Sequence, residues 1–170
     1  SDQKKLKGFR HVVQGEADDF MYGIEFRNGI SALKPFNYTY DILIFERQLP
    51  AAISLVKDFP NQKFVIDHIA KPDIKSGSID SWKSGIEEIA KYNNVWCKVS
   101  GMVTEADWKN WKPEDLKPYL DVIFENFQTD KILYGSDWPV LNVASDYNEV
   151  VKTLEDYISK FSIEDQNKIW

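Results

Sequence analysis

Ionisable residues lie in or directly after four short apolar segments of this sequence. Arg10 and Lys98 stand inside two such segments, His68 ends a third, and Asp137 follows a fourth after a Gly-Ser pair. Carboxylate and imidazole groups transfer protons near neutral pH, and guanidinium and ammonium groups bind anions or hydroxyl groups. Residues of these types could therefore carry out a proton-transfer reaction and hold its polar substrate.

Each of these residues also has a purely structural interpretation. Asp137 could cap the loop that follows it, and His68 could be a hydrogen-bonded histidine without a catalytic role. Burying an unpaired ammonium is costly, so Lys98 needs a partner, either a structural acid or a substrate carboxylate. Gln14 is a further polar candidate for substrate binding, and Trp138 could line a pocket or pack under a loop.

Five short apolar segments alternate with segments of helical periodicity. The predicted strands are residues 6–14, 38–45, 63–68, 94–100 and 131–135. The predicted helices are residues 20–36, 46–59, 80–90 and 113–127, with two more that begin near residues 145 and 162. This alternation predicts an α/β fold with a parallel sheet, either a (β/α) barrel or a doubly wound sheet. No glycine-rich nucleotide-binding motif follows any of the strands.

Polar residues occur near the carboxyl ends of all five predicted strands. They are Arg10, His11, Gln14, Asp41, Asp67, His68, Lys98, Ser100 and Asp137. All strands of a parallel barrel end on the same side, so we expect these side chains to converge on one pocket. Since neighbouring residues of a strand point to opposite faces, we expect His68 to point into the pocket and Asp67 to brace a loop or helix.

The composition narrows the class of protein. The length fits a single domain, residues 1–170, and the net charge of −6 with scattered basic residues argues against a nucleic-acid partner. No apolar run is long enough to cross a membrane and no signal peptide precedes the first strand, so we expect a soluble, cytoplasmic protein. The single cysteine, Cys97, cannot form an internal disulfide and indicates a buried structural thiol.

The sequence alone gives little support for a metal site. It contains two histidines and no H-x-H, H-E-x-x-H or C-x-x-C motif. His68 and Asp137 would supply two ligands, whereas a bound zinc ion takes three or four from the protein. One divalent metal ion, with zinc as the candidate, and no cofactor at all both stay open.

Four segments together resemble a known family. They are GFRHVVQ from residue 8, FVIDHIAKP from residue 64, VWCKVSGM from residue 95 and ILYGSDWPV from residue 132. With D-H-x-x-K-P and Y-G-S-D-W-P as its most specific motifs, the chain resembles the amidohydrolase-2 family, in the branch of L-fuconolactonase and 2-pyrone-4,6-dicarboxylate lactonase. The resemblance implies a (β/α)₈ TIM barrel like that of metal-dependent hydrolases, of which this chain resembles strands three to eight with their helices.

The resemblance also implies an activity, the hydrolysis of a sugar lactone or a carboxylated lactone. His68 matches the histidine after the family's fifth strand, and Asp137 matches the aspartate after its eighth strand, which handles the hydrolytic water. Arg10 and Lys98 match positions that hold substrate carboxylates or hydroxyls. The expected substrate-binding residues are Arg10, Gln14, Lys98 and Trp138. The alternatives are a barrel decarboxylase of the same superfamily and a non-catalytic barrel fragment.

The family begins with a strand that carries H-x-H and with a second strand, and neither is found here. We therefore expect the chain to be the C-terminal two-thirds of a longer barrel protein. Partner chains that cover the gap are the alternative, and a homo-oligomer is left open. In either case part of the active site lies outside these residues, which puts the activity of the chain alone in question.

Overall fold

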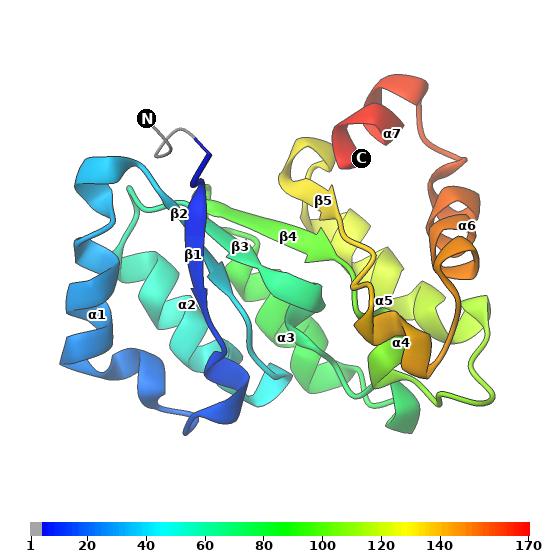
Figure 1. The fold of residues 1–170 in the computed structure, drawn as a ribbon, viewed down its shortest axis with the longest axis horizontal. Helices are drawn as coiled ribbons and strands as arrows, with labels where there is room; N and C mark the ends of the chain where they lie inside the picture. Colours follow the sequence, from blue (N-terminus) through cyan, green and yellow to red (C-terminus); the bar gives the residue numbers. More distant parts are fainter. Residues whose placement is uncertain (1–4) are drawn as a thin grey trace.

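The computed structural model describes residues 5–170, in which a parallel sheet is packed against helices (Figure 1). In chain order the elements are β1 (Gly8–His11), α1 (Ile24–Ser31), β2 (Thr39–Ile42), α2 (Leu49–Asp58), β3 (Phe64–Ile66), α3 (Asp80–Ile89), β4 (Val95–Val99), α4 (Met102–Glu105), α5 (Pro113–Asn126), β5 (Ile132–Tyr134), α6 (Tyr147–Ile158) and α7 (Ile163–Ile169). Short 3₁₀ turns join several of these elements. The predicted α/β alternation is confirmed.

The order of the strands decides between the two architectures that the sequence left open. The five strands lie in the order β1-β2-β3-β4-β5, and every neighbouring pair is parallel. A doubly wound sheet reverses its strand order at a switch point, whereas a barrel adds each new strand on the same side. The sheet therefore has the strand order of a barrel segment.

The structure has fewer strands than the family resemblance implies for this part of the barrel. Strands three to eight would be six strands, and the part of the chain that the structure describes has five, as the sequence pattern indicated. His68 follows β3 and Asp137 follows β5, so only β4 separates the two residues. If His68 followed the fifth strand of the family barrel and Asp137 followed the eighth, two strands would lie between them. Only one does, so the two assignments cannot both be correct for the observed sheet.

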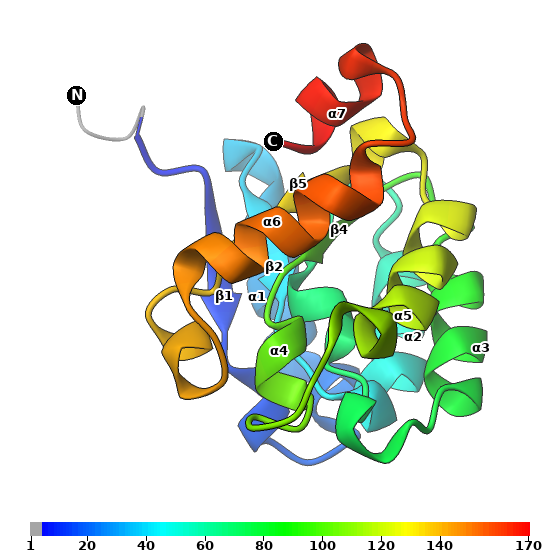
Figure 2. The same cartoon turned by 90° about the vertical axis from the view of Figure 1, so that its right-hand side faces the viewer.

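The sheet has two chemically different faces. Buried and half-buried residues alternate in β2 and β4, because successive side chains of a strand point in opposite directions. The buried face carries Tyr40, Ile42, Phe64, Ile66, Val95, Cys97, Val99 and Ile132. The other face carries Arg10, Asp41 and Lys98, with Arg10 directly opposite Asp41 in the register of β1 and β2. In Figure 2 helices α2, α3 and α5 stand together on one side of the strands.

Glycine, proline and capping residues set the helix boundaries. The expected helix 20–36 is broken into a 3₁₀ turn at Phe20–Tyr22, helix α1 and a second 3₁₀ turn at Lys34–Phe36. Gly23 has extended backbone before α1, and Pro35 lies in the second turn. At the other end of the chain α7 begins where the sequence predicted a helix, and the side chain of Ser162 caps it by accepting a hydrogen bond from the backbone N–H of Asp165. Within residues 5–170 no helix is long and apolar enough to cross a membrane.

Alanine substitutions at two helical glycines can test how the helices pack. A Cβ atom at Gly29 of α1 would meet nothing within 4 Å, whereas one at Gly85 of α3 would lie 2.7 Å from Cδ1 of Leu49 in α2. Alanine is favoured over glycine by about 1 kcal/mol inside a helix. Gly29→Ala should therefore raise the free energy of unfolding by about 0.5–1 kcal/mol. Gly85→Ala should lower it by about 1–2 kcal/mol, because buried Leu49 has little room to move.

Urea denaturation of the two variants measures both changes under the same conditions. The substitution is identical, so the difference between the variants reports the contact between α3 and α2. A stabilising effect of Gly85→Ala equal to that of Gly29→Ala would contradict this packing.

Candidate active site

The carboxyl ends of the strands bring the predicted polar residues together, as the sequence analysis expected. Arg10 comes from β1, Asp41 from β2 and Lys98 from β4. Asp67 and His68 follow β3 directly. Ion pairs and hydrogen bonds join these residues across strands that are far apart in sequence.

An alternating chain of charges links four strands at this edge. Arg10 Nη1 donates to Oδ2 of Asp67 at 2.9 Å, and Lys98 Nζ donates to Oδ1 of the same carboxylate. Lys98 Nζ also donates to Oδ2 of Asp41 at 3.1 Å. The order of the chain is therefore Arg10, Asp67, Lys98 and Asp41, and we call these residues the charge network. Two cations and two carboxylates make its formal charge zero.

Asp67 has a more central place than the sequence predicted. We expected it to brace a loop or helix, but its side chain is completely buried and each of its oxygens binds a different cation. The reason is that β3 ends at Ile66, so the alternation of a strand does not extend to the next two residues. The sequence did contain a signal: an ammonium inside an apolar strand, such as that of Lys98, needs an acidic partner, and few acids lie near it along the predicted strands.

The backbone turns sharply after Asp67. His68, Ile69, Ala70 and Lys71 have φ values of 52°, 47°, 60° and 46°, which place four consecutive non-glycine residues in the left-handed region. Each such residue costs about 1–2 kcal/mol relative to a right-handed conformation. We call residues 68–71 the left-handed turn. Strain of this kind is kept where the surrounding structure enforces it, and it concentrates at functional sites.

The left-handed turn directs His68 toward β4 and β5. Nδ1 of His68 and Oγ of Ser100 form a hydrogen bond at 2.7 Å, and Nε2 lies 3.7 Å from Oδ1 of Asp137. Gly101 provides the space for the ring, since a Cβ atom there would lie 2.8 Å from Nδ1. The side chains of His68 and Asp137 are 12% and 14% exposed. The two predicted catalytic residues thus face each other in a partly water-shielded site.

Burial and neighbouring charges shift the pKa values of His68, Lys98 and Arg10. Burial lowers the pKa of His68, and the neighbouring carboxylates of Asp137 and Asp67 only partly oppose this effect, so the imidazole is neutral at pH 7. Burial also works to lower the pKa of Lys98, but its bonds to Asp67 and Asp41 outweigh burial and raise it. The hydrogen bond to Asp67 raises the pKa of Arg10. Both cations therefore stay charged.

The remaining predicted residues are less closely tied to this site. Gln14 bonds to Leu43 through its backbone N–H, and its buried Oε1 has no hydrogen-bond partner within the described part of the chain. Trp138 is 65% exposed in the loop after Asp137. His11 contacts Glu16 at 2.8 Å on the surface and does not join His68. The roles of Gln14 and Trp138 in substrate binding remain predictions.

The described residues do not form a complete metal site. One ion could touch both His68 and Asp137, given the 3.7 Å between their nearest atoms. No group of three or more His, Cys, Asp or Glu residues in residues 5–170 is arranged to hold an ion. The pair provides two ligands where zinc needs three or four, so we derive no step through a metal. The thiol of Cys97 is buried, as predicted, and burial raises its pKa.

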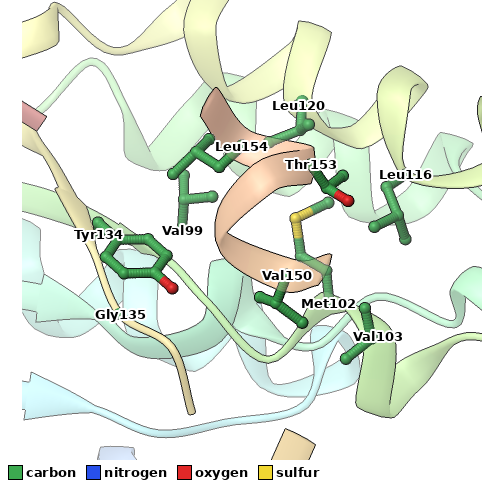
Figure 3. A pocket seen from close by; sticks show the side chains of 10 residues that line it. All are labelled: Val99, Met102, Val103, Leu116, Leu120, Tyr134, Gly135, Val150, Thr153 and Leu154. Carbon is green, nitrogen blue, oxygen red and sulfur yellow. The ribbon is translucent and has the colours of Figure 1, made fainter. Parts of the chain in front are cut away.

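A separate cavity lies on the helix side of the sheet, behind the ends of β4 and β5 (Figure 3). Its volume is about 30 Å³, enough for one or two water molecules. Figure 3 shows apolar side chains around it, among them Val99, Leu120 and Leu154, with the hydroxyl of Tyr134 as one of few polar groups. Burial raises the pKa of Tyr134 to about 12. Neither the charge-network residues nor His68 and Asp137 line this cavity, so it lies outside the candidate site.

Comparison with known proteins agrees with the sequence resemblance. A family model described as amidohydrolase matches residues 2–169. The L-fucono-1,5-lactonase of Burkholderia multivorans is 35% identical over 98% of this chain, which covers 60% of that protein. The L-rhamnono-gamma-lactonase of Scheffersomyces stipitis is 25% identical over 90% of this chain and 53% of its own length.

A solved structure supports the same conclusion for the fold. The crystal structure of an amidohydrolase from Burkholderia multivorans with bound zinc is 35% identical and superposes with a TM-score of 0.92. The match covers 98% of this chain and 62% of that chain. The five-stranded sheet thus corresponds to part of an amidohydrolase TIM barrel, and the chain spans about 60% of the length of the first relatives it matches.

The substitution Asp67→Asn tests the importance of the charge network. It removes the charge that both Arg10 and Lys98 contact, and Lys98 keeps only Asp41. We expect the free energy of unfolding to fall by about 2 kcal/mol. This is below the roughly 3–5 kcal/mol of a fully buried pair, because both cations are partly exposed.

The matched control is Asp156→Asn, which breaks an exposed pair with Lys152 on α6. That variant should unfold at the same urea concentration as the parent, since exposed ion pairs contribute little. If the two variants unfolded alike, the charge network would have no special role in stability.

Proposed function

The chain belongs to the amidohydrolase family, and we propose that in the complete polypeptide its site hydrolyses the ring ester of an uncharged sugar lactone. The observation that carries this proposal is the approach of Asp137 to His68 at 3.7 Å, at the edge where the charge network lies. The two curated relatives named above are sugar lactonases, which supports the substrate class.

Asp137 acts as the general base in this proposal. Its carboxylate accepts a proton from a water molecule while the water oxygen attacks the lactone carbonyl carbon. A C–O bond forms, and negative charge develops on the carbonyl oxygen. Asp137 then returns the proton to the ring oxygen as the ring C–O bond breaks, and the product is an open-chain hydroxy acid.

His68 supplies a neutral hydrogen-bonding group beside the reacting atoms. When Ser100 donates its hydroxyl to Nδ1, the proton of the neutral ring is on Nε2, the nitrogen nearest Asp137. An N–H group at this place stabilises the developing oxyanion and orients the carboxylate. The lowered pKa of His68 keeps the ring in this neutral form at pH 7.

The charge network favours an uncharged substrate over a carboxylated one. Arg10 and Lys98 each pair with acids of the protein, so their positive charges are already neutralised. Both side chains retain further N–H groups, which can donate to substrate hydroxyls. A substrate carboxylate at this site would compete with Asp67 and Asp41 and would be repelled by Asp137. A polyhydroxylated lactone meets no such repulsion.

Replacing Asp137 with Asn tests the general base. In the complete polypeptide we expect kcat for lactone hydrolysis to fall by at least about 100-fold, because an amide cannot take the proton. The matched control is Asp130→Asn, which makes the same change in an exposed residue at the other end of β5 and should leave kcat unchanged. Hydrolysis by Asp137→Asn at the parent rate would refute the proposed role.

A substrate panel tests the reaction class. The complete polypeptide is assayed with uncharged aldonolactones, with lactones that carry a carboxylate, and with unsaturated carboxylic acids whose decarboxylation releases carbon dioxide. We expect kcat/KM to be at least about tenfold higher for the uncharged lactones than for the carboxylated ones. Carbon dioxide release would instead identify the decarboxylase alternative, and turnover of no compound would favour a non-catalytic barrel.

A further inference from the structure

The left-handed turn receives a hydrogen bond from a helix that contributes nothing else to the site. Trp82 lies in α3, fully buried, and its Nε1 donates to the backbone carbonyl of Ile69 at 2.6 Å. Its ring packs against Tyr119 of α5, with the ring centroids 5.2 Å apart, so its own position is fixed by a second helix. Neither Trp82 nor Tyr119 contacts His68, Asp137 or the charge network through any polar contact in residues 5–170.

This turn needs contacts from outside, because its own backbone does not favour it. Four consecutive residues with side chains adopt positive φ values, which L-amino acids avoid. Within the turn one backbone hydrogen bond closes the loop, from Lys71 N–H to the carbonyl of His68 at 2.8 Å. The remaining support comes from packing and side-chain contacts.

We propose that Trp82 is a positioning residue of the active site, which holds His68 in its catalytic orientation by fixing the left-handed turn from outside. The inference rests on the proposed function, in which His68 acts beside Asp137. It also goes beyond that function, because Trp82 touches neither the substrate nor the reacting atoms.

The orientation of His68 is sensitive to this support. The ring fits between the hydroxyl of Ser100 and the bare backbone of Gly101, where a single added carbon would lie 2.8 Å from Nδ1. Rotation of the backbone at residues 68 and 69 would swing the ring out of this narrow space. It would also lengthen the 3.7 Å approach to Asp137. Misplacing a catalytic group by about 1 Å can lower a rate by about 100-fold.

Besides the hydrogen bond of His68 itself to Ser100, the turn has two side-chain polar contacts, and Trp82 is the better placed of the two to exert this control. The second support is the ion pair of Lys71 Nζ with Oε1 of Glu105 at 2.8 Å, which sits at the last residue of the turn. Trp82 instead binds Ile69, the neighbour of His68, and both Trp82 and Ile69 are fully buried. If the indole N–H were lost, the carbonyl of Ile69 would be left without a partner in an apolar place. The turn would then relax toward conformations in which water or another donor reaches that carbonyl.

The substitution Trp82→Phe removes the N–H donor and keeps an aromatic ring. In the complete polypeptide we expect kcat per folded molecule to fall about 10- to 100-fold, while KM changes by less than about twofold, since the residues predicted to bind substrate are unaltered. A crystal structure of the variant should show Nε2 of His68 displaced from Oδ1 of Asp137. The matched control is Trp108→Phe, which removes an indole N–H that donates to the carbonyl of Thr104 at 2.8 Å and is largely exposed. It should leave kcat and KM unchanged.

A second variant separates positioning from general stability. Glycine adopts positive φ without penalty, so adding Ala70→Gly at φ 60° should restore the turn and bring kcat of the double variant to within about threefold of the parent. A merely structural role of Trp82 would lower the melting temperature and leave kcat per folded molecule unchanged. That result, or a double variant that regains stability without regaining kcat, overturns the proposal.

The remaining outcomes are also decisive. If Trp82→Phe alone does not fold, the double variant must fold and regain kcat, and failure in either overturns the proposal. If the parent protein hydrolyses no lactone, the proposed function fails. The inference about Trp82 is then decided by the crystal structures alone, with an unmoved His68 in Trp82→Phe as the contrary result.

Discussion

Asp67 is a buried carboxylate held between two cations, and the edge of the sheet is organised around it. Its side chain has no contact with solvent, and its two oxygens bind Arg10 from β1 and Lys98 from β4. Lys98 extends the network to Asp41 on β2. Four neighbouring strands are thereby linked through side chains as well as through their backbone ladders. A buried charge is tolerated only with such partners, so the network fixes where the cationic side chains stand at the mouth of the site.

These ion pairs change the role that Arg10 and Lys98 can play toward a ligand. From the sequence, Lys98 could pair either with an acid of the protein or with a substrate carboxylate, and Arg10 was expected to bind substrate. In the fold the charges of both are balanced by acids of the same chain. Asp137 is therefore the one carboxylate of the site that binds neither cation of the network in the described structure. A carboxylate without a cationic partner, beside a neutral histidine, suits proton abstraction from water. The balanced charges of the network and the placement of Asp137 beside His68 are therefore the features on which the proposed hydrolysis of an uncharged ester rests.

The support of the site extends beyond its polar residues. The left-handed turn places His68 against the ends of β4 and β5. Ser100 and Gly101, which follow β4, contact the His68 ring, and Trp82 of α3 donates to the backbone of Ile69 in the turn. Helix α3 also packs against α2 and α5, on the side of the sheet away from the charge network. Packing of the outer helices and geometry of the site are therefore linked, because the strained turn takes its shape from both sides of the sheet.

The sequence by itself determined the alternation of strands and helices, the parallel sheet and the gathering of polar residues at one edge. These features depend on local periodicity and on the rule that parallel strands end on the same side. Only the tertiary structure decided that Asp67 lies at the centre, that Arg10 and Lys98 are neutralised, and that His68 leaves the strand in a left-handed conformation. The physical reason is that these properties arise from contacts between residues 13 to 57 positions apart, such as Trp82 with Ile69 and Arg10 with Asp67. A local pattern carries no information about which of several possible partners such a residue meets.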